Sequence, residues 1–152
     1  MSRFIRWITK SPFSHAWIAF YDVTLGQRMV MQAEAWGYEV RPWKRWSREN
    51  IWKYEFVLPY DAHADSAVSE ISKYLGSDYD YKSAILLGIK NWIKKWLKKP
   101  LHSPGKLMCS EAVIRFLGMT SLGNYGLDPE LSAPEMLLEK MEVDNRLTLL
   151  PL

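Results

Sequence analysis

The sequence predicts an α+β fold in which helices pack a small antiparallel sheet. The first half of the chain is rich in aromatic and β-favouring residues, in short runs separated by Gly26 and Gly37. After Pro59, apolar residues recur at helical spacing instead. The length of 152 residues, with 48% hydrophobic and 24% charged residues, is typical of one globular domain. We therefore expect residues 1–152 to form a single domain.

An antiparallel meander is expected in the first half. Strands are predicted at residues 14–22, 28–36, 38–43 and 51–58. The last range has the clearest alternation, because aromatic and aliphatic residues at even positions alternate with charged residues.

Helices are expected in the second half. The predicted ranges are 64–75, 82–99 and 109–117, which end at Gly76, Pro100 and Gly118 respectively. A short helix is predicted after Pro134, and the last residues are expected to form an edge strand or to be irregular.

Cys109 is the only cysteine, so the chain forms no internal disulfide and has no thiolate cluster for zinc. It opens the predicted helix 109–117. Unpaired N–H groups at a helix N-terminus lower the pKa of a thiol and can stabilise an oxyanion. Both properties suit a thiolate nucleophile. The alternative is that Cys109 is a small buried hydrophobic residue.

Three histidines are candidates for the base that such a nucleophile needs. His63 and His102 lie in polar or proline-flanked segments, where histidine is usually a surface residue, and His102 is kept in reserve. His15 precedes an apolar run, where an imidazole is costly unless it has partners or faces a cleft. We therefore predict His15 as the base.

Hairpin geometry selects a partner for His15. If the turn after the first strand centres on Thr24 and Leu25, opposed residue numbers sum to about 49 and Glu34 lies across from His15. Glu34 would then orient the imidazole. A turn one residue later would place Trp36 opposite His15, with Glu34 diagonal to it. The remaining alternative is that these polar residues occupy the solvent face of a strand.

Four short motifs occur in a recognisable order. They are His15 on an early strand, Glu34-Ala35 on the next, the segment Leu75-Gly76-Ser77-Asp78-Tyr79-Asp80-Tyr81, and Met108-Cys109-Ser110-Glu111 at a helix start. This order resembles the circularly permuted NlpC-type papain-fold hydrolases, the YiiX-like and lecithin-retinol-acyltransferase-like group, over residues 11–117. In that group the histidine precedes the cysteine, as it does here.

The resemblance implies a permuted papain-like fold and acyl-transfer chemistry. It makes Cys109 the nucleophile, His15 the general base and then acid, and Glu34 the residue that fixes the imidazole tautomer. The backbone N–H of Cys109 would contribute to the oxyanion hole. The expected substrate is an amide bond in peptidoglycan peptides, ahead of a lipid acyl group, and no cofactor or metal is expected. The candidates for lining the substrate cleft are Tyr79, Tyr81, Gln32 and Trp17.

The predicted helix 82–99 places tryptophans and isoleucines on one face and lysines largely on the other. This pattern fits a helix that lies on an anionic membrane or cell-wall surface. The net charge of +3 also favours anionic surfaces. The simpler alternative is a core helix with a solvated lysine face, and no motif supports nucleic-acid binding. The candidate surface residues are Lys90, Trp92, Lys94, Lys95 and Trp96.

Charges interrupt the first ten residues, and no apolar run approaches the roughly 18 residues of a membrane span. The sequence therefore predicts a protein that is cytoplasmic as synthesised. YiiX-like proteins, which the motif order resembles, often act on the cell envelope and carry an export signal. A phage origin, or release to the envelope by another route, would reconcile the two. A catalytically silent module that binds an envelope polymer, a membrane or a protein is the alternative from a different functional class.

Overall fold

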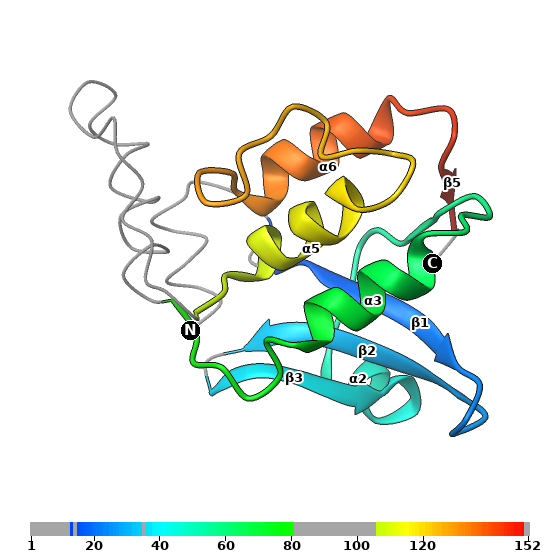
Figure 1. The fold of residues 1–152 in the computed structure, drawn as a ribbon, viewed down its shortest axis with the longest axis vertical. Coiled ribbons are helices and arrows are strands. Elements are labelled where there is room, and N and C mark those ends of the chain that lie inside the picture. Colours follow the sequence, from blue (N-terminus) through cyan, green and yellow to red (C-terminus); the bar gives the residue numbers. More distant parts are fainter. Residues whose placement is uncertain (1–12, 14, 35, 81–105, 151–152) are drawn as a thin grey trace.

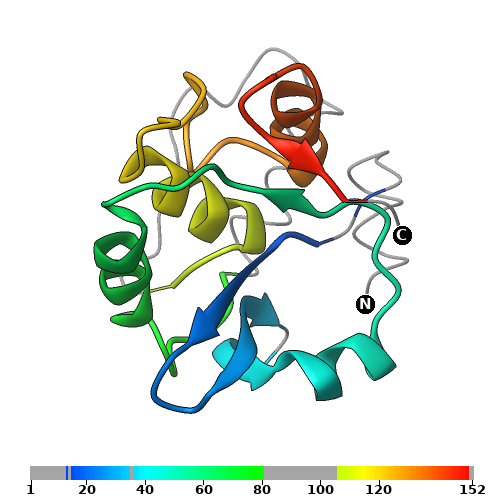
Figure 2. The same ribbon diagram turned by 90° about the vertical axis from the view of Figure 1, so that its right-hand side faces the viewer.

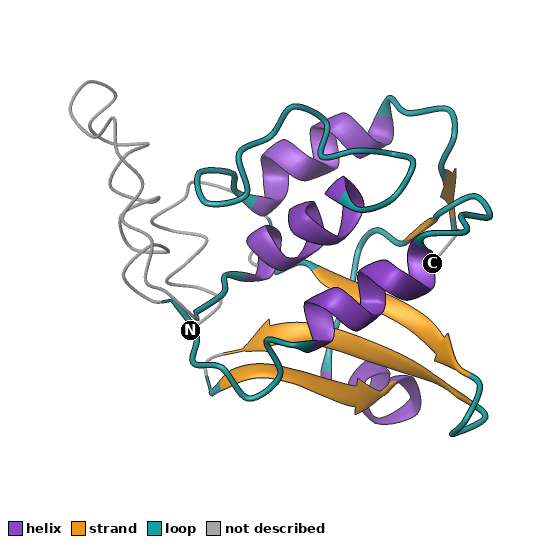
Figure 3. Cartoon of the chain, viewed as in Figure 1, coloured by secondary structure: helices purple, strands orange, loops and turns teal. Residues whose placement is uncertain are grey.

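The computed structural model describes residues 13, 15–34, 36–80 and 106–150. It confirms an α+β fold with a small antiparallel sheet (Figures 1 and 3). The strands are β1 (Trp17–Asp22), β2 (Gln27–Glu34), β3 (Gly37–Pro42), β4 (Phe56–Val57) and β5 (Thr148–Leu149). The helices in the described part of the chain are α2 (Trp43–Glu49), α3 (Ala64–Ser72), α5 (Cys109–Gly118) and α6 (Pro134–Glu142).

The first three strands form one sheet in the order β1-β2-β3. Trp17 lies opposite Gln32 and Asp22 lies opposite Gln27, so opposed residue numbers sum to 49. The prediction that the first turn centres on Thr24 and Leu25 is therefore confirmed. The Asp22 carboxylate stabilises this turn by accepting a hydrogen bond from the Leu25 N–H at 2.9 Å.

Helices cover both faces of this sheet. Helices α3 and α5 lie side by side on one face, with α6 beyond α5 (Figure 1). Helix α2 packs against β2 and β3 from the other face (Figure 2). Side-chain alternation along β2 agrees with this arrangement, because Met31 joins the core around α5 whereas Gln32 contacts α2.

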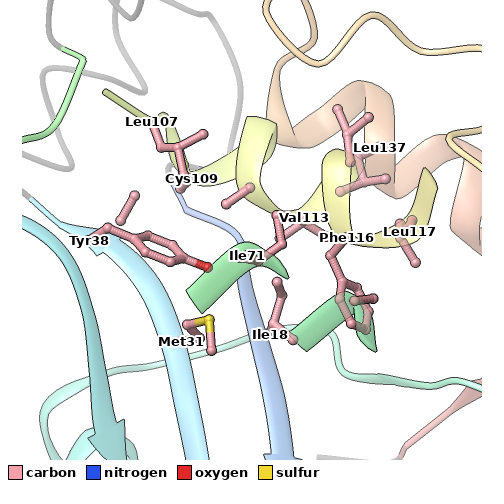
Figure 4. Packing of buried hydrophobic residues seen from close by; sticks show 14 of the residues in the cluster. Ile18, Met31, Tyr38, Ile71, Leu107, Cys109, Val113, Phe116, Leu117 and Leu137 are labelled. Atoms are coloured by element: carbon pink, nitrogen blue, oxygen red, sulfur yellow. The ribbon is translucent and has the colours of Figure 1, made fainter. Parts of the chain in front are cut away.

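The main core fills the space between the sheet and helices α3, α5 and α6 (Figure 4). Helix α5 lies at its centre, and eight of its ten residues are buried, Glu111 among them. Met31 from β2 and Ile71 from α3 pack into the same cluster, with exposed fractions of 2% and 1%. Burial of this apolar surface fixes the start of α5 relative to the start of β1.

Two backbone contacts tie the loop after α3 to the sheet. The Tyr38 N–H donates to the Ser77 carbonyl and the Gly76 N–H donates to the Tyr38 carbonyl, each at 2.9 Å. Gly37 permits this approach because it has a φ of +129° and a Cβ there would lie 2.6 Å from the Ser77 oxygen. Farther along, Tyr79 forms a bridge with Leu107, two residues before Cys109.

In the middle of the chain one element was missed and one was predicted wrongly. Residues 43–49 form helix α2, which was not predicted. Of the predicted strand 51–58, only Phe56 and Val57 are a strand, and they pair with β5 rather than with the meander. The even-numbered side chains of this segment are partly buried, whereas Ile51, Lys53 and Val57 are exposed, so the alternation reflects a chain with one buried side.

The predicted helices agree more closely. The helix expected at 109–117 spans Cys109–Gly118, and the one expected after Pro134 is α6. The helix expected at 64–75 ends at Ser72, and turns follow it. The predicted helix 82–99 lies outside the described residues, and so does Tyr81. The candidate surface residues of that helix are Lys90, Trp92, Lys94, Lys95 and Trp96. Among those that are described, no helix is long and apolar enough to cross a membrane.

Candidate active site

Cys109 is the first residue of α5 and is 4% exposed. Met108 precedes it in an extended conformation, and the Glu111 carboxylate accepts a hydrogen bond from the Met108 N–H at 3.3 Å. This contact satisfies a donor at the helix start and places a negative charge in its first turn, both of which stabilise a helix N-terminus. The thiol is thereby held at a fixed position at the end of the sheet.

His15, just before β1, and Cys109 form a hydrogen-bonded pair. Burial alone would lower the pKa of His15, but the hydrogen bond and charge of Cys109, with smaller effects of Glu34 and Gln32, raise it to about 9. The pair is therefore stabilised as an imidazolium beside a thiolate.

The cysteine shows the complementary effect. Burial would raise the pKa of the Cys109 thiol, but the hydrogen bond and charge of His15 lower it. Hydrogen bonds from the Ala16 and Ser110 N–H groups lower this pKa further. These backbone donors stabilise the thiolate at any pH, because amide N–H groups do not titrate in the range where proteins fold.

The third position of the site involves two side chains from β2. The Nε2 atom of His15 lies 3.0 Å from the Gln32 Oε1 atom, within hydrogen-bonding distance, and 3.8 Å from the Glu34 Oε1 atom. Gln32 is 1% exposed, whereas the Glu34 side chain is 26% exposed. The structure thus places both next to the imidazole, with Gln32 in the direct hydrogen bond and Glu34 as the nearby charge.

Gln32 has two further partners. Its Oε1 atom accepts a hydrogen bond from the indole Nε1 of Trp46 at 2.6 Å, and its Nε2 atom donates to Glu39 at 3.0 Å. Glu39 also forms an ion pair with Arg41. Sequence reasoning missed Trp46 and Glu39 as members of the site. The spacing of Trp43 and Trp46 directly after Pro42 was the available signal, since it is helical and follows a helix-starting proline.

Trp46 belongs to a cluster of four indoles, Trp17, Trp43, Trp46 and Trp52, whose contacting rings have centroids 4.8 to 5.6 Å apart. The Arg28 guanidinium lies 3.8 Å from the centroid of the Trp43 ring. This tryptophan cluster covers the face of the sheet opposite α5. It buries Trp46 to 1% exposure and so shields the polar contacts of Gln32 from water.

A cavity of about 1520 Å³ opens beside the site. His15, Glu34, Trp17 and Tyr79 line it, together with β1, the segment 49–62 and parts of α3, α5 and α6. Its walls are mostly aromatic and aliphatic. Of the described candidates, Gln32 and Cys109 are not in the wall: Gln32 is enclosed by its partners, and Cys109 as a residue is only 4% exposed.

The described residues hold no group of three or more histidine, cysteine, aspartate or glutamate side chains that could bind a metal ion. Comparison with known proteins does not assign the chain to a family, since no family model, curated protein or solved structure matches it.

Proposed function

We propose that this protein is a cysteine hydrolase that cleaves an amide bond by acyl transfer, with Cys109 as nucleophile and His15 as base. The hydrogen-bonded pair of His15 with a cysteine at a helix N-terminus carries the proposal. These two residues are far apart in the sequence, and a buried thiol with no chemical role gains nothing from a histidine partner. The permuted papain-like fold is part of the same proposal. It is supported by the order of the elements, since the strand next to His15 precedes the helix that begins at Cys109.

The pair suits the chemistry step by step. His15 holds the thiol proton as an imidazolium, and the Cys109 thiolate attacks the substrate carbonyl carbon to form a tetrahedral oxyanion. Backbone N–H groups of the first turn of α5, that of Cys109 included, would stabilise this oxyanion. The imidazolium then gives its proton to the leaving amine, the C–N bond breaks and a thioester remains. Water, deprotonated by His15, hydrolyses the thioester and regenerates the thiol.

Peptidoglycan peptides are the proposed substrate, on the resemblance of the motifs alone. The apolar walls of the cavity support a second candidate, a lipid acyl ester, because long acyl chains need such walls. The same pair would cleave either bond, since both reactions pass through a thioester.

The test is to incubate the wild-type chain and Cys109→Ser with purified muropeptides and with phospholipid vesicles, and to follow the products by mass spectrometry. Release of a peptide fragment or a fatty acid by the wild-type chain alone is the expected result. Trapping of the thioester with hydroxylamine would identify the acyl group. A Cys109→Ser variant that matches the wild type, or binding of either substrate without turnover, would favour a silent binding module instead.

A further inference from the structure

The three strands of the sheet carry one row of directly opposed residues, Trp17, Gln32 and Glu39. Gln32 lies in the middle of this row and is 1% exposed. Helix α2 covers the row and brings Trp46 onto Gln32. The amide of Gln32 therefore has a different neighbour at each end and a third, His15, next to its oxygen. These neighbours determine which way the amide points.

Trp46 fixes the oxygen end. An indole N–H can only donate a hydrogen bond, so the amide atom that faces it must be the acceptor. The 2.6 Å distance between the Trp46 Nε1 and Gln32 Oε1 atoms is too short for two donors to face each other.

Glu39 fixes the nitrogen end. Its carboxylate is ion-paired with Arg41 and also accepts a hydrogen bond from the Trp36 indole at 2.9 Å. An ionised carboxylate only accepts hydrogen bonds, so the amide group that faces it at 3.0 Å must be the NH₂ group. Rotating the amide by half a turn would break both contacts and set like dipoles against each other inside the protein.

A fixed amide has a consequence for His15. The Gln32 Oε1 atom accepts hydrogen bonds only, so the His15 Nε2 atom that lies 3.0 Å from it must carry a proton. In the neutral ring the other nitrogen, Nδ1, then holds the lone pair. We propose that Trp46 and Glu39 are positioning residues that fix the tautomer of His15 through Gln32.

The inference deepens the proposed function, and rests on it for the role of His15 as base. With Nε2 always protonated, Nδ1 is the atom that takes the proton from Cys109 and returns it. Gln32 then serves both states of the ring, since the same Nε2–H donates to it before and after Nδ1 is protonated. Glu34, 3.8 Å from Nε2, acts through its charge rather than through the direct hydrogen bond.

The tautomer is measured directly by ¹⁵N NMR of His15. The Cys109→Ala background is used, because without the thiolate the ring is neutral at high pH and its tautomer is visible. Trp46→Phe removes the indole donor, and Glu39→Gln replaces an obligate acceptor with a group that can donate or accept. Trp43→Phe is the matched control, since it removes an indole of the same tryptophan cluster whereas the hydrogen bond to Gln32 comes from Trp46.

The expected result is one tautomer with the proton on Nε2 in the background and in Trp43→Phe, and a mixture of tautomers in Trp46→Phe and Glu39→Gln. A proton on Nδ1 in the background protein would overturn the inference. A ring that keeps its single tautomer in both Trp46→Phe and Glu39→Gln would do so as well. If Trp46→Phe does not fold, the partly exposed Glu39→Gln decides the question alone.

A kinetic measurement separates this inference from the proposed function. In the chain that retains Cys109, Trp46→Phe is expected to slow the reaction with iodoacetamide at neutral pH about tenfold, because it removes the hydrogen bond that holds the Gln32 oxygen toward His15. Loss of comparable outer hydrogen bonds around metal-bound histidines has an effect of this size. Trp43→Phe is expected to leave the rate unchanged. If the wild-type thiol has ordinary reactivity but His15 has a single tautomer, the proposed hydrolase is contradicted and the positioning of His15 is not. If the thiol is reactive but His15 has mixed tautomers, the positioning is contradicted and the hydrolase is not.

Discussion

Burial and hydrogen bonding act in opposite directions on Cys109. Burial favours the neutral thiol, while His15 and two backbone N–H groups favour the thiolate and lower its pKa. Of these stabilising effects the largest comes from His15, through its hydrogen bond and then its charge. The reactivity of the sulfur therefore depends on a side chain that a single substitution removes.

We predict that iodoacetamide alkylates Cys109 at a pH well below about 8.5, the usual pKa of a free thiol. His15→Ala is expected to raise the pH of half-maximal rate, because it removes the largest effect that lowers the thiol pKa. His63→Ala, an exposed histidine before α3, is the control and should leave the profile unchanged. The measurement is the alkylation rate against pH, and coinciding profiles for His15→Ala and the wild-type chain would contradict the pairing.

Glu34 provides a second prediction at this scale. Its charge contributes to raising the pKa of His15 above 6.5, to about 9. Glu34→Gln removes the charge and keeps the size of the side chain, so His15 should lose its proton at a lower pH. The change should be small, because Glu34 is 26% exposed and water screens its charge. An NMR titration of the His15 ring measures it, and an unchanged or higher pKa would count against an electrostatic role.

Gln32→Ala tests the direct contact. It removes the hydrogen bond at 3.0 Å and leaves the Trp46 indole N–H and the Glu39 carboxylate without their amide partner. The Trp46 indole N–H is buried, and an unsatisfied buried group costs about 1–3 kcal/mol, so the variant should be both less stable and slower in alkylation. The alkylation rate of the folded protein should fall more than in Glu34→Gln, and the reverse order would make Glu34 the main orienting group.

Among the elements, the loop after α3 depends on a glycine. Gly37→Ala places a Cβ 2.6 Å from the Ser77 oxygen at a φ of +129°, so we expect it to destabilise the protein by about 3 kcal/mol. Gly26→Ala is the matched control, since its φ is +63° but the added Cβ meets nothing within 4 Å. It should cost about 1 kcal/mol. Urea denaturation measures both, and equal losses would mean that the contact with Ser77 contributes little.

The elements also show what the sequence can predict. Helix α5 was predicted to within one residue, because an apolar face and a closing glycine are local signals. The register of β1 and β2 followed from the position of one turn. Helix α2 was missed because seven residues are too short for a clear helical period and no side chain caps its start.

Segment 51–58 failed for a different reason. Its alternation indicates one apolar and one polar side, which is a property of any extended chain with one buried side. Whether the backbone pairs with a neighbouring strand depends on what lies beside it, and that is not a local property. Here the partner of β4 is β5, from the far end of the chain, and the whole segment lines the cavity.

At the scale of the whole molecule, the site depends on contacts between distant segments. The order of His15 and Cys109 in the sequence suggested that they meet, but the contact of Gln32 with Trp46 required knowing that α2 covers the sheet. The cavity combines β1, the segment after α2 and three helices. Because no single segment forms the cavity, its presence beside His15 was not predictable from a local sequence pattern.

This cavity provides the last prediction. Leu138 of α6 lines it and is partly exposed, so Leu138→Trp should narrow the cavity without disturbing the main core. If the substrate extends into the cavity, KM should rise about tenfold or more, since the added ring competes with substrate for the same apolar wall. Leu138→Met, which conserves volume, is the control and should behave like the wild-type chain.

The alkylation rate of Cys109 should stay the same in both Leu138 variants, because iodoacetamide is too small to need the cavity. A slower alkylation in Leu138→Trp would mean that the substitution has displaced α5, against which α6 packs. An unchanged KM with normal alkylation would place the substrate elsewhere, and the large cavity would then have no part in recognition. KM and the alkylation rate together thus separate the binding of substrate in the cavity from the reactivity of Cys109 at the end of the sheet.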